Sequence, residues 1–217
     1  MSERRAKAKR IFTILEEQNP RPVTELNFET PWQLLVATVL SAQSTDKQVN
    51  KVTSLLFVKY PHPAQLAALM PEELAAEIKS IGLFRTKSKH LVASAKALLE
   101  RHGGEVPADL PSLLALPGVG QKTANVILAN AFGIPALAVD THVFRVANRL
   151  GLVKAKTPTA TEQQLTSLIA RELWTDAHHW LILHGRYICH ARNPHCTHCS
   201  LSEHCDYFHR QENRKGR

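Results

Sequence analysis

The stretch that decides the fold of this chain is LPGVGQKTA, residues 116–124. Leucines precede it, and its proline and glycine must end the helical segment that those leucines form. Gly118 and Gly120 favour a tight turn, because glycine adopts backbone conformations that other residues avoid. A second helix is expected over residues 121–129, and Gly133 follows it as a stop signal. The sequence therefore predicts two helices joined by a glycine hairpin.

The hairpin is a candidate phosphate site, formed by Gly118, Val119 and Gly120. A helix N-terminus presents free backbone N–H groups, and the helix dipole favours an anion there. The phosphates of a DNA backbone are natural partners for such groups. A plain turn is the alternative interpretation, because the stretch lacks the third glycine and the preceding strand of a dinucleotide-binding fingerprint.

Two polar residues near the hairpin are candidates for chemistry. Lys122 lies at the start of the second helix, where the dipole disfavours a cation and so favours the neutral, nucleophilic amine. An ordinary solvated lysine is the plainer interpretation. Asp140 precedes Thr-His-Val-Phe, a pattern typical of a helix N-cap. Capping and catalysis are compatible, because either role holds the carboxylate at the mouth of a helix.

Residues 116–124, together with VDTH at 139–142, resemble the helix-hairpin-helix and following aspartate of the endonuclease III family of DNA glycosylases. The stretch LSAQSTD at 40–46 and four C-terminal cysteines match the family too, so the resemblance covers nearly the whole chain. It implies that Lys122 and Asp140 are catalytic. It also implies DNA-binding roles for the hairpin, for Gln43, which fills the space left by an extruded base, for Leu83, which wedges into the duplex, and for His142.

The four cysteines lie within 17 residues and are Cys189, Cys196, Cys199 and Cys205. Such clustering indicates one metal site in a reducing compartment rather than a disulfide framework. Zinc sites usually carry two Cys-x2-Cys pairs, whereas this segment has one, with neighbouring histidines as competing ligands. These histidines are His190, His195, His198 and His204. Spacing alone leaves zinc and iron–sulfur open, and the family resemblance implies a [4Fe–4S] cluster.

The remaining chain predicts an all-α fold, because no segment shows convincing strand alternation between turn signals. In the third expected helix, Val49, Val52, Leu55 and Leu56 should point inward. The family resemblance implies two helical lobes, residues 24–134 and residues 1–23 plus 135–217, with a DNA-binding groove between them. We expect helices over residues 2–18, 31–40, 46–60, 63–69, 71–78, 85–101, 121–129, 141–150, 159–174 and 176–189.

Composition is consistent with a DNA-binding protein. The chain has 217 residues, enough to bury a substantial core, and its net charge of +8 favours an anionic partner. Its few scattered aromatic residues argue against a single-strand stacking platform and favour contacts with a duplex backbone. No apolar run is long enough to cross a bilayer, and the N-terminal segment is not a signal peptide. We expect a monomeric, cytoplasmic, nucleoid-associated protein with no membrane partner.

The resemblance implies a base excision repair enzyme for double-stranded DNA that contains damaged bases or abasic sites. By resemblance, it flips out oxidised pyrimidines, removes them, and nicks the strand 3′ to the abasic site by β-elimination through a lysine Schiff base. An adenine-mismatch glycosylase of the same superfamily is one alternative, although such enzymes generally lack a lysine at the position of Lys122 and carry an extra C-terminal domain. A non-catalytic helix-hairpin-helix DNA-binding protein is the other, and it leaves Lys122 and Asp140 unexplained.

Overall fold

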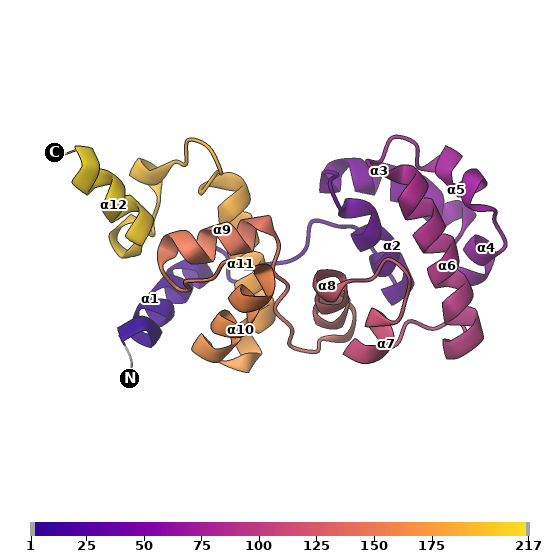
Figure 1. Cartoon of the computed structure of the whole chain (residues 1–217), viewed down its shortest axis with the longest axis horizontal. Coiled ribbons are helices and arrows are strands. Elements are labelled where there is room, and N and C mark those ends of the chain that lie inside the picture. The colour runs from indigo at the N-terminus through magenta and orange to yellow at the C-terminus, as the bar shows by residue number, and fades with distance from the viewer. Residues whose placement is uncertain (1–2, 216–217) are drawn as a thin grey trace. The chain divides into compact units, whose positions relative to one another are not determined.

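The computed structural model describes residues 3–215, and every regular element in that range is a helix (Figure 1). The predicted all-α class is therefore confirmed. The chain divides into two compact units. We call residues 24–134 the hairpin unit, and residues 1–23 with 135–217 the cysteine unit. Within residues 3–215, no helix is both long and apolar enough to span a membrane.

The hairpin unit is built around α2 (Pro31–Ser41). The Thr30 hydroxyl accepts a hydrogen bond from the Gln33 N–H at 3.2 Å, and Pro31 occupies the first helical position, so the helix begins where its capping signals indicate. Every residue from Trp32 to Leu40 is buried, as expected of a helix that is apolar on all sides. It packs against α3 (Asp46–Lys59), α6 (Phe84–His102) and α8 (Gln121–Phe132).

Three short helices complete this unit: α4 (Pro63–Ala67), α5 (Pro71–Glu77) and α7 (Leu110–Leu114). One expectation for α3 is wrong, because Leu55 is 69% exposed. The buried residues of α3 are Val49, Thr53 and Leu56, spaced four and three positions apart on one helical face. Leu55 and Leu56 are adjacent and lie about 100° apart around the helix, so only one of them faces the core. Val52 is half-buried.

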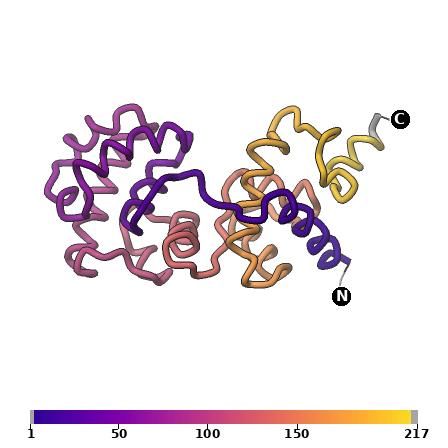
Figure 2. The backbone as a smooth tube through the Cα atoms, turned by 180° about the vertical axis from the view of Figure 1, so that it is seen from behind, coloured from indigo at the N-terminus to yellow at the C-terminus, as the bar shows by residue number. Residues whose placement is uncertain are grey.

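The cysteine unit combines the N-terminal helix with the C-terminal part of the chain, and Figure 2 shows the indigo helix beside the orange segment. Its helices are α1 (Glu3–Gln18), α9 (Thr141–Leu150), α10 (Pro158–Leu168), α11 (Trp174–Tyr187) and α12 (Asp206–Lys215), with short 3-10 turns at Arg171–Leu173, Cys196–His198 and Ser202–His204. One apolar core unites α1, α9 and α11. It reaches residues 189–205, which we call the cysteine segment, at Leu201 and Cys205.

Some helix boundaries differ from those expected. The helix expected over 159–174 ends at Leu168, because Ile169 adopts an extended conformation with φ −117° and ψ 154°. The next helix therefore begins at Trp174. Helix α12 was not expected, because its sequence is mostly polar and shows no apolar periodicity. It is held to α1 by an ion pair between Lys7 and Asp206. The expected start of the first helix at residue 2 lies outside the described residues.

Candidate active site and cysteine pocket

The hairpin between α7 and α8 is tightly supported by α6. Gly118 has a φ of 78°, in the left-handed region, and a Cβ added there would lie 2.7 Å from the Cβ of His90. The Pro117 carbonyl accepts a hydrogen bond from the buried Ser94 hydroxyl at 2.5 Å. The side chain of Val119 is buried, so only its backbone is available to a ligand. Position 118 therefore requires glycine, and the turn has a defined shape.

Gly120 has a different role from the one expected. Its φ of −100° and ψ of 177° are extended backbone that any residue adopts, so the predicted conformational need for glycine is wrong at this position. Gly120 is the N-cap of α8, and no side chain caps the helix there. Among the described residues, nothing lies within 4 Å of an added Cβ. The N-terminus of α8 thus opens into free space, as an anion site at a helix N-terminus requires.

Lys122 lies two residues after the N-cap, in the first turn of α8, and its side chain is half-buried. The positive end of the helix dipole is at this turn. The structure therefore places Lys122 directly beside the hairpin within the hairpin unit, where the sequence predicted it.

Asp140 is the N-cap of α9 in the cysteine unit, again as predicted. Its Oδ1 accepts hydrogen bonds from the backbone N–H groups of His142 and Val143, both at 2.8 Å, and its Oδ2 lies 3.1 Å from His142 Nδ1. Burial raises the pKa of Asp140, but the hydrogen bonds from His142 and Val143 and the nearby charges of His142 and His178 together hold it well below its usual range. The carboxylate is therefore ionised at neutral pH.

His178, on α11, was not identified from the sequence. It is buried, and its Nδ1 lies 2.7 Å from the carbonyl oxygen of Ala138, two residues before Asp140. It therefore orders the segment that leads into the cap of α9. In the sequence, a histidine with a functional role in a buried helix looks the same as one that only packs in the core. His178 therefore could not be identified from the sequence.

Gln43 and Leu83 both adopt left-handed backbone conformations, with φ of 55° and 57°. For residues other than glycine, such conformations cost about 1–3 kcal/mol and cluster at functional sites. Leu83 is 56% exposed, so its side chain does not pack into the core. The two turns lie side by side: the Gly82 N–H donates to Ser44 Oγ at 3.2 Å, and a Cβ added at Gly82 would lie 3.1 Å from the Gln43 carbonyl oxygen.

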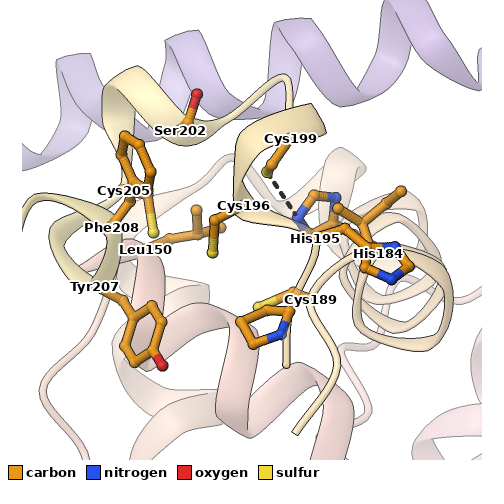
Figure 3. A pocket seen from close by; sticks show the side chains of 12 residues that line it. Leu150, His184, Cys189, His195, Cys196, Cys199, Ser202, Cys205, Tyr207 and Phe208 are labelled. Atoms are coloured by element: carbon orange, nitrogen blue, oxygen red, sulfur yellow. Dashed lines mark hydrogen bonds between the residues drawn. The ribbon is translucent and has the colours of Figure 1, made fainter. Parts of the chain in front are cut away.

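All four cysteines line one pocket of the cysteine unit (Figure 3). None of the four is in a disulfide bond. The pKa of Cys199 is raised to about 11, mainly by burial and also by the nearby charges of the other three cysteines, against the lowering effect of a hydrogen bond from the Leu201 backbone. Of the four histidines considered as competing ligands, His195 lines this pocket. Within residues 3–215, no three His, Cys, Asp or Glu side chains converge closely enough to hold a single metal ion.

Two arginines of α9 hold the cysteine segment, and sequence reasoning missed both. Arg149 Nη1 donates to the carbonyl oxygen of His190 at 2.6 Å and lies 3.4 Å from Cys189 Sγ. Arg145 Nε donates to the Cys189 carbonyl oxygen at 3.0 Å. His184 Nε2 lies 3.6 Å from Cys199 Sγ, the contact drawn as the dashed line in Figure 3. The signal that could have found the arginines is their spacing of four, which places both on one face of α9.

The comparisons with known proteins define the class first. The model of the HhH-GPD superfamily of base excision DNA repair proteins matches residues 36–171. Endonuclease III of Rickettsia conorii is 51% identical over 199 residues, covering 92% of this chain and 95% of the relative. Endonuclease III of Escherichia coli K12 is 48% identical over 203 residues, covering 94% and 96%. A solved structure of a trapped endonuclease III–DNA covalent intermediate has a TM-score of 0.92 and 41% identity, covering 96% of this chain and 98% of that one.

The chain therefore belongs to the endonuclease III family within this superfamily. The predicted activity is confirmed with it: the protein is a base excision repair enzyme, a DNA glycosylase and apurinic/apyrimidinic (AP) lyase for oxidised pyrimidines.

Proposed function

We propose that Lys122 is the nucleophile of this glycosylase and lyase, acting on damaged bases and abasic sites in double-stranded DNA. The observation that carries the proposal is the position of Lys122, in the first turn of a helix whose N-terminus is open and lacks a side-chain cap. Backbone phosphates bound at the hairpin bring the neighbouring sugar toward the same turn. Because the enzyme works on DNA, we also assign it to the nucleoid.

The chemistry follows from an amine at this position. The Lys122 amine attacks C1′ of the sugar, and the bond from C1′ to the base breaks as the base leaves with its electron pair and gains a proton. Ring opening gives a Schiff base between Nζ and C1′. Loss of a proton from C2′ then expels the 3′ phosphate, which breaks the C3′–O bond and nicks the strand. Water finally hydrolyses the imine and frees the lysine. The related solved structure is a covalent endonuclease III–DNA intermediate, which supports this route.

Asp140 stabilises the positive charge that develops on the sugar as the base departs. Its low pKa and its three hydrogen-bond contacts, with His142 and Val143, keep the carboxylate ionised and fixed in orientation. The same low pKa makes it a weak base, so charge stabilisation is its main contribution and assistance to proton transfer is secondary.

The remaining predicted residues bind and deform the DNA. Gln43 and Leu83 enter the duplex where the damaged base leaves the stack, because both are presented at exposed, adjacent turns. The backbone of Gly118, Val119 and Gly120 binds phosphate. A solved endonuclease III–DNA complex with a TM-score of 0.92 to this chain supports duplex DNA as the ligand.

The four cysteines fit a [4Fe–4S] cluster, and we assign Cys189, Cys196, Cys199 and Cys205 as its ligands. The support is the donor set: four cysteine thiols line one pocket, Arg149 Nη1 donates toward Cys189 Sγ, and His184 Nε2 lies 3.6 Å from Cys199 Sγ. When bound, such a cluster cross-links the segment, and with four thiolate ligands it offers no open position to water. The purified protein should be yellow-brown, with iron and sulfide in equal amounts. A colourless, zinc-loaded and fully active protein would refute the assignment.

Borohydride trapping tests the central assignment. With a duplex that carries one thymine glycol, borohydride should reduce the imine and leave a covalent protein–DNA adduct. Lys122→Gln should lose trapping and strand nicking together while still binding the duplex, because the hairpin amides are unchanged. Lys96→Gln, at an exposed position of α6, removes the same charge and should trap normally. Wild-type trapping by Lys122→Gln would show that another amine is the nucleophile.

A further inference from the structure

Lys87 is a buried lysine in the hairpin unit and has no part in the chemistry above. It lies near the start of α6 and is 4% exposed. Its Nζ donates hydrogen bonds to the carbonyl oxygen of Leu40, at 2.9 Å, and to that of Ala42. Lysine is almost never fully buried unless its charge is satisfied. Burial here lowers its pKa.

The two carbonyl groups lie at the C-terminal end of α2, where backbone acceptors have no partner within the helix. A cation is favoured there by the helix dipole. Ala42 directly precedes Gln43, whose left-handed backbone makes the turn sharp. The ammonium group of Lys87 therefore holds the residue on which the Gln43 turn begins.

The backbone of Lys87 is connected to the other insertion residue. Its N–H donates to the carbonyl oxygen of Leu83 at 3.0 Å, and Leu83 is the left-handed N-cap of α6. One residue thus joins both turns, through its side chain to one and its main chain to the other. A second connection is the Gly82–Ser44 hydrogen bond at 3.2 Å.

We propose that Lys87 is a positioning residue for base extrusion, which fixes the Gln43 and Leu83 turns relative to each other so that both side chains enter the duplex together. Left-handed conformations outside glycine persist only where the surroundings enforce them, and Lys87 supplies that enforcement. Turns ordered in advance avoid an entropy cost when DNA binds. This inference rests on the proposed insertion roles of Gln43 and Leu83.

A purely structural role would give a different result. If Lys87 only stabilised the fold, its loss would reduce the amount of folded protein and lower every activity in the same proportion. A positioning role should act on the step that unstacks a base. It should therefore slow removal of an intact damaged base much more than cleavage at a preformed abasic site.

The experiment compares Lys87→Met with Lys96→Met, which removes the same charge from an exposed position of the same helix. Single-turnover rates are measured on thymine glycol and abasic duplexes, with 2-aminopurine opposite the lesion to report unstacking by fluorescence. Lys87→Met should slow base removal by about 10- to 100-fold, the range expected for lost hydrogen bonds to a buried charge. Its abasic-site cleavage should fall far less, its 2-aminopurine signal should be reduced, and Lys96→Met should match the wild type. Equal losses on both duplexes would overturn the proposal.

Ser44→Ala keeps the proposal testable if Lys87→Met does not fold, because it removes only the second connection between the turns. It should shift the ratio of the two rates in the same direction by a smaller factor, and an unchanged ratio would count against the proposal. Gln43→Ala and Leu83→Ala separate this inference from the proposed function. If neither slows base removal, the insertion roles themselves are wrong. If both do while Lys87→Met and Ser44→Ala leave the ratio unchanged, only the positioning role is wrong.

Discussion

Replacing Gly118 with alanine tests the physical basis of the hairpin. A left-handed φ of 78° costs about 1–2 kcal/mol for a residue with a Cβ. The new Cβ would also lie 2.7 Å from the Cβ of His90 and 2.9 Å from two of its ring atoms. The exposed ring can rotate away, but the His90 Cβ is fixed to the backbone of α6, so the hairpin or the helix must move. Such overpacking adds about 1–3 kcal/mol.

The sum predicts that Gly118→Ala lowers the free energy of unfolding by about 2–5 kcal/mol. Gly120→Ala is the matched control, because its extended backbone accepts alanine and nothing among the described residues lies within 4 Å of the new methyl group. Alanine caps a helix less well than glycine, which lowers stability, but it also reduces the entropy of the unfolded chain, which raises stability. The net change in the free energy of unfolding should therefore stay within about 1 kcal/mol.

The two variants should also differ in their effects on DNA affinity. The methyl group of Gly120→Ala occupies the open mouth of α8, where we place a phosphate, so this variant should keep its stability and lose affinity for an abasic-site duplex. Urea unfolding and fluorescence anisotropy at fixed salt measure the two effects. Two results would refute the reasoning: a Gly118→Ala protein as stable as the wild type, or a Gly120→Ala protein destabilised as much as Gly118→Ala.

Three further outcomes are expected. Because the pKa of Asp140 is depressed in the folded state, its carboxylate stabilises the fold above the ordinary aspartate pKa of about 3.9, and this contribution is lost as the pH falls below that value. Asp140→Asn should therefore be less stable by about 1–2 kcal/mol at pH 7, with the difference narrowing below pH 4 in thermal unfolding. Cys199→Ser should yield less folded protein and less bound iron, measured by absorbance and metal analysis, because metal binding contributes to folding. Arg149→Met should loosen the segment around Cys189, seen as faster amide hydrogen exchange at residues 189–191, and unchanged exchange there would contradict the contacts described.

The features predicted correctly from the sequence are those with local causes. The proline and Gly118 of the hairpin end one helix and permit the next within a few residues, so the signal and the structure occupy the same stretch. Asp140 caps α9 through N–H groups only two and three positions away. The four cysteines lie within 17 residues, so almost any compact path of the segment brings them near one another.

The features that were missed depend on contacts distant in sequence. Lys87 looks like any lysine of a charged helix, and its burial arises only because the end of α2, more than forty residues earlier, meets it. The role of Arg149 likewise depends on its hydrogen bond to the carbonyl oxygen of His190, which lies 41 positions later. The prediction for Leu55 was wrong for another reason. Its apolar side chain suggested burial, but the adjacent Leu56 faces the core, and two adjacent residues of a helix point in different directions.

Helix α6 connects the parts of the hairpin unit to which we assign DNA contacts. Leu83 caps its start, Lys87 holds the Gln43 turn, His90 lies beneath Gly118, and Ser94 holds the Pro117 carbonyl. These positions are four, three and four residues apart, which places them along one face of a helix. The Gln43 and Leu83 turns and the hairpin therefore take their relative positions from a single rigid element. A one-residue deletion between Lys87 and His90 would keep these four side chains yet turn the two that support the hairpin by about 100° relative to the Gln43 and Leu83 turns. The relative positions of these turns therefore depend on the register of α6 as well as on the residues of the turns themselves.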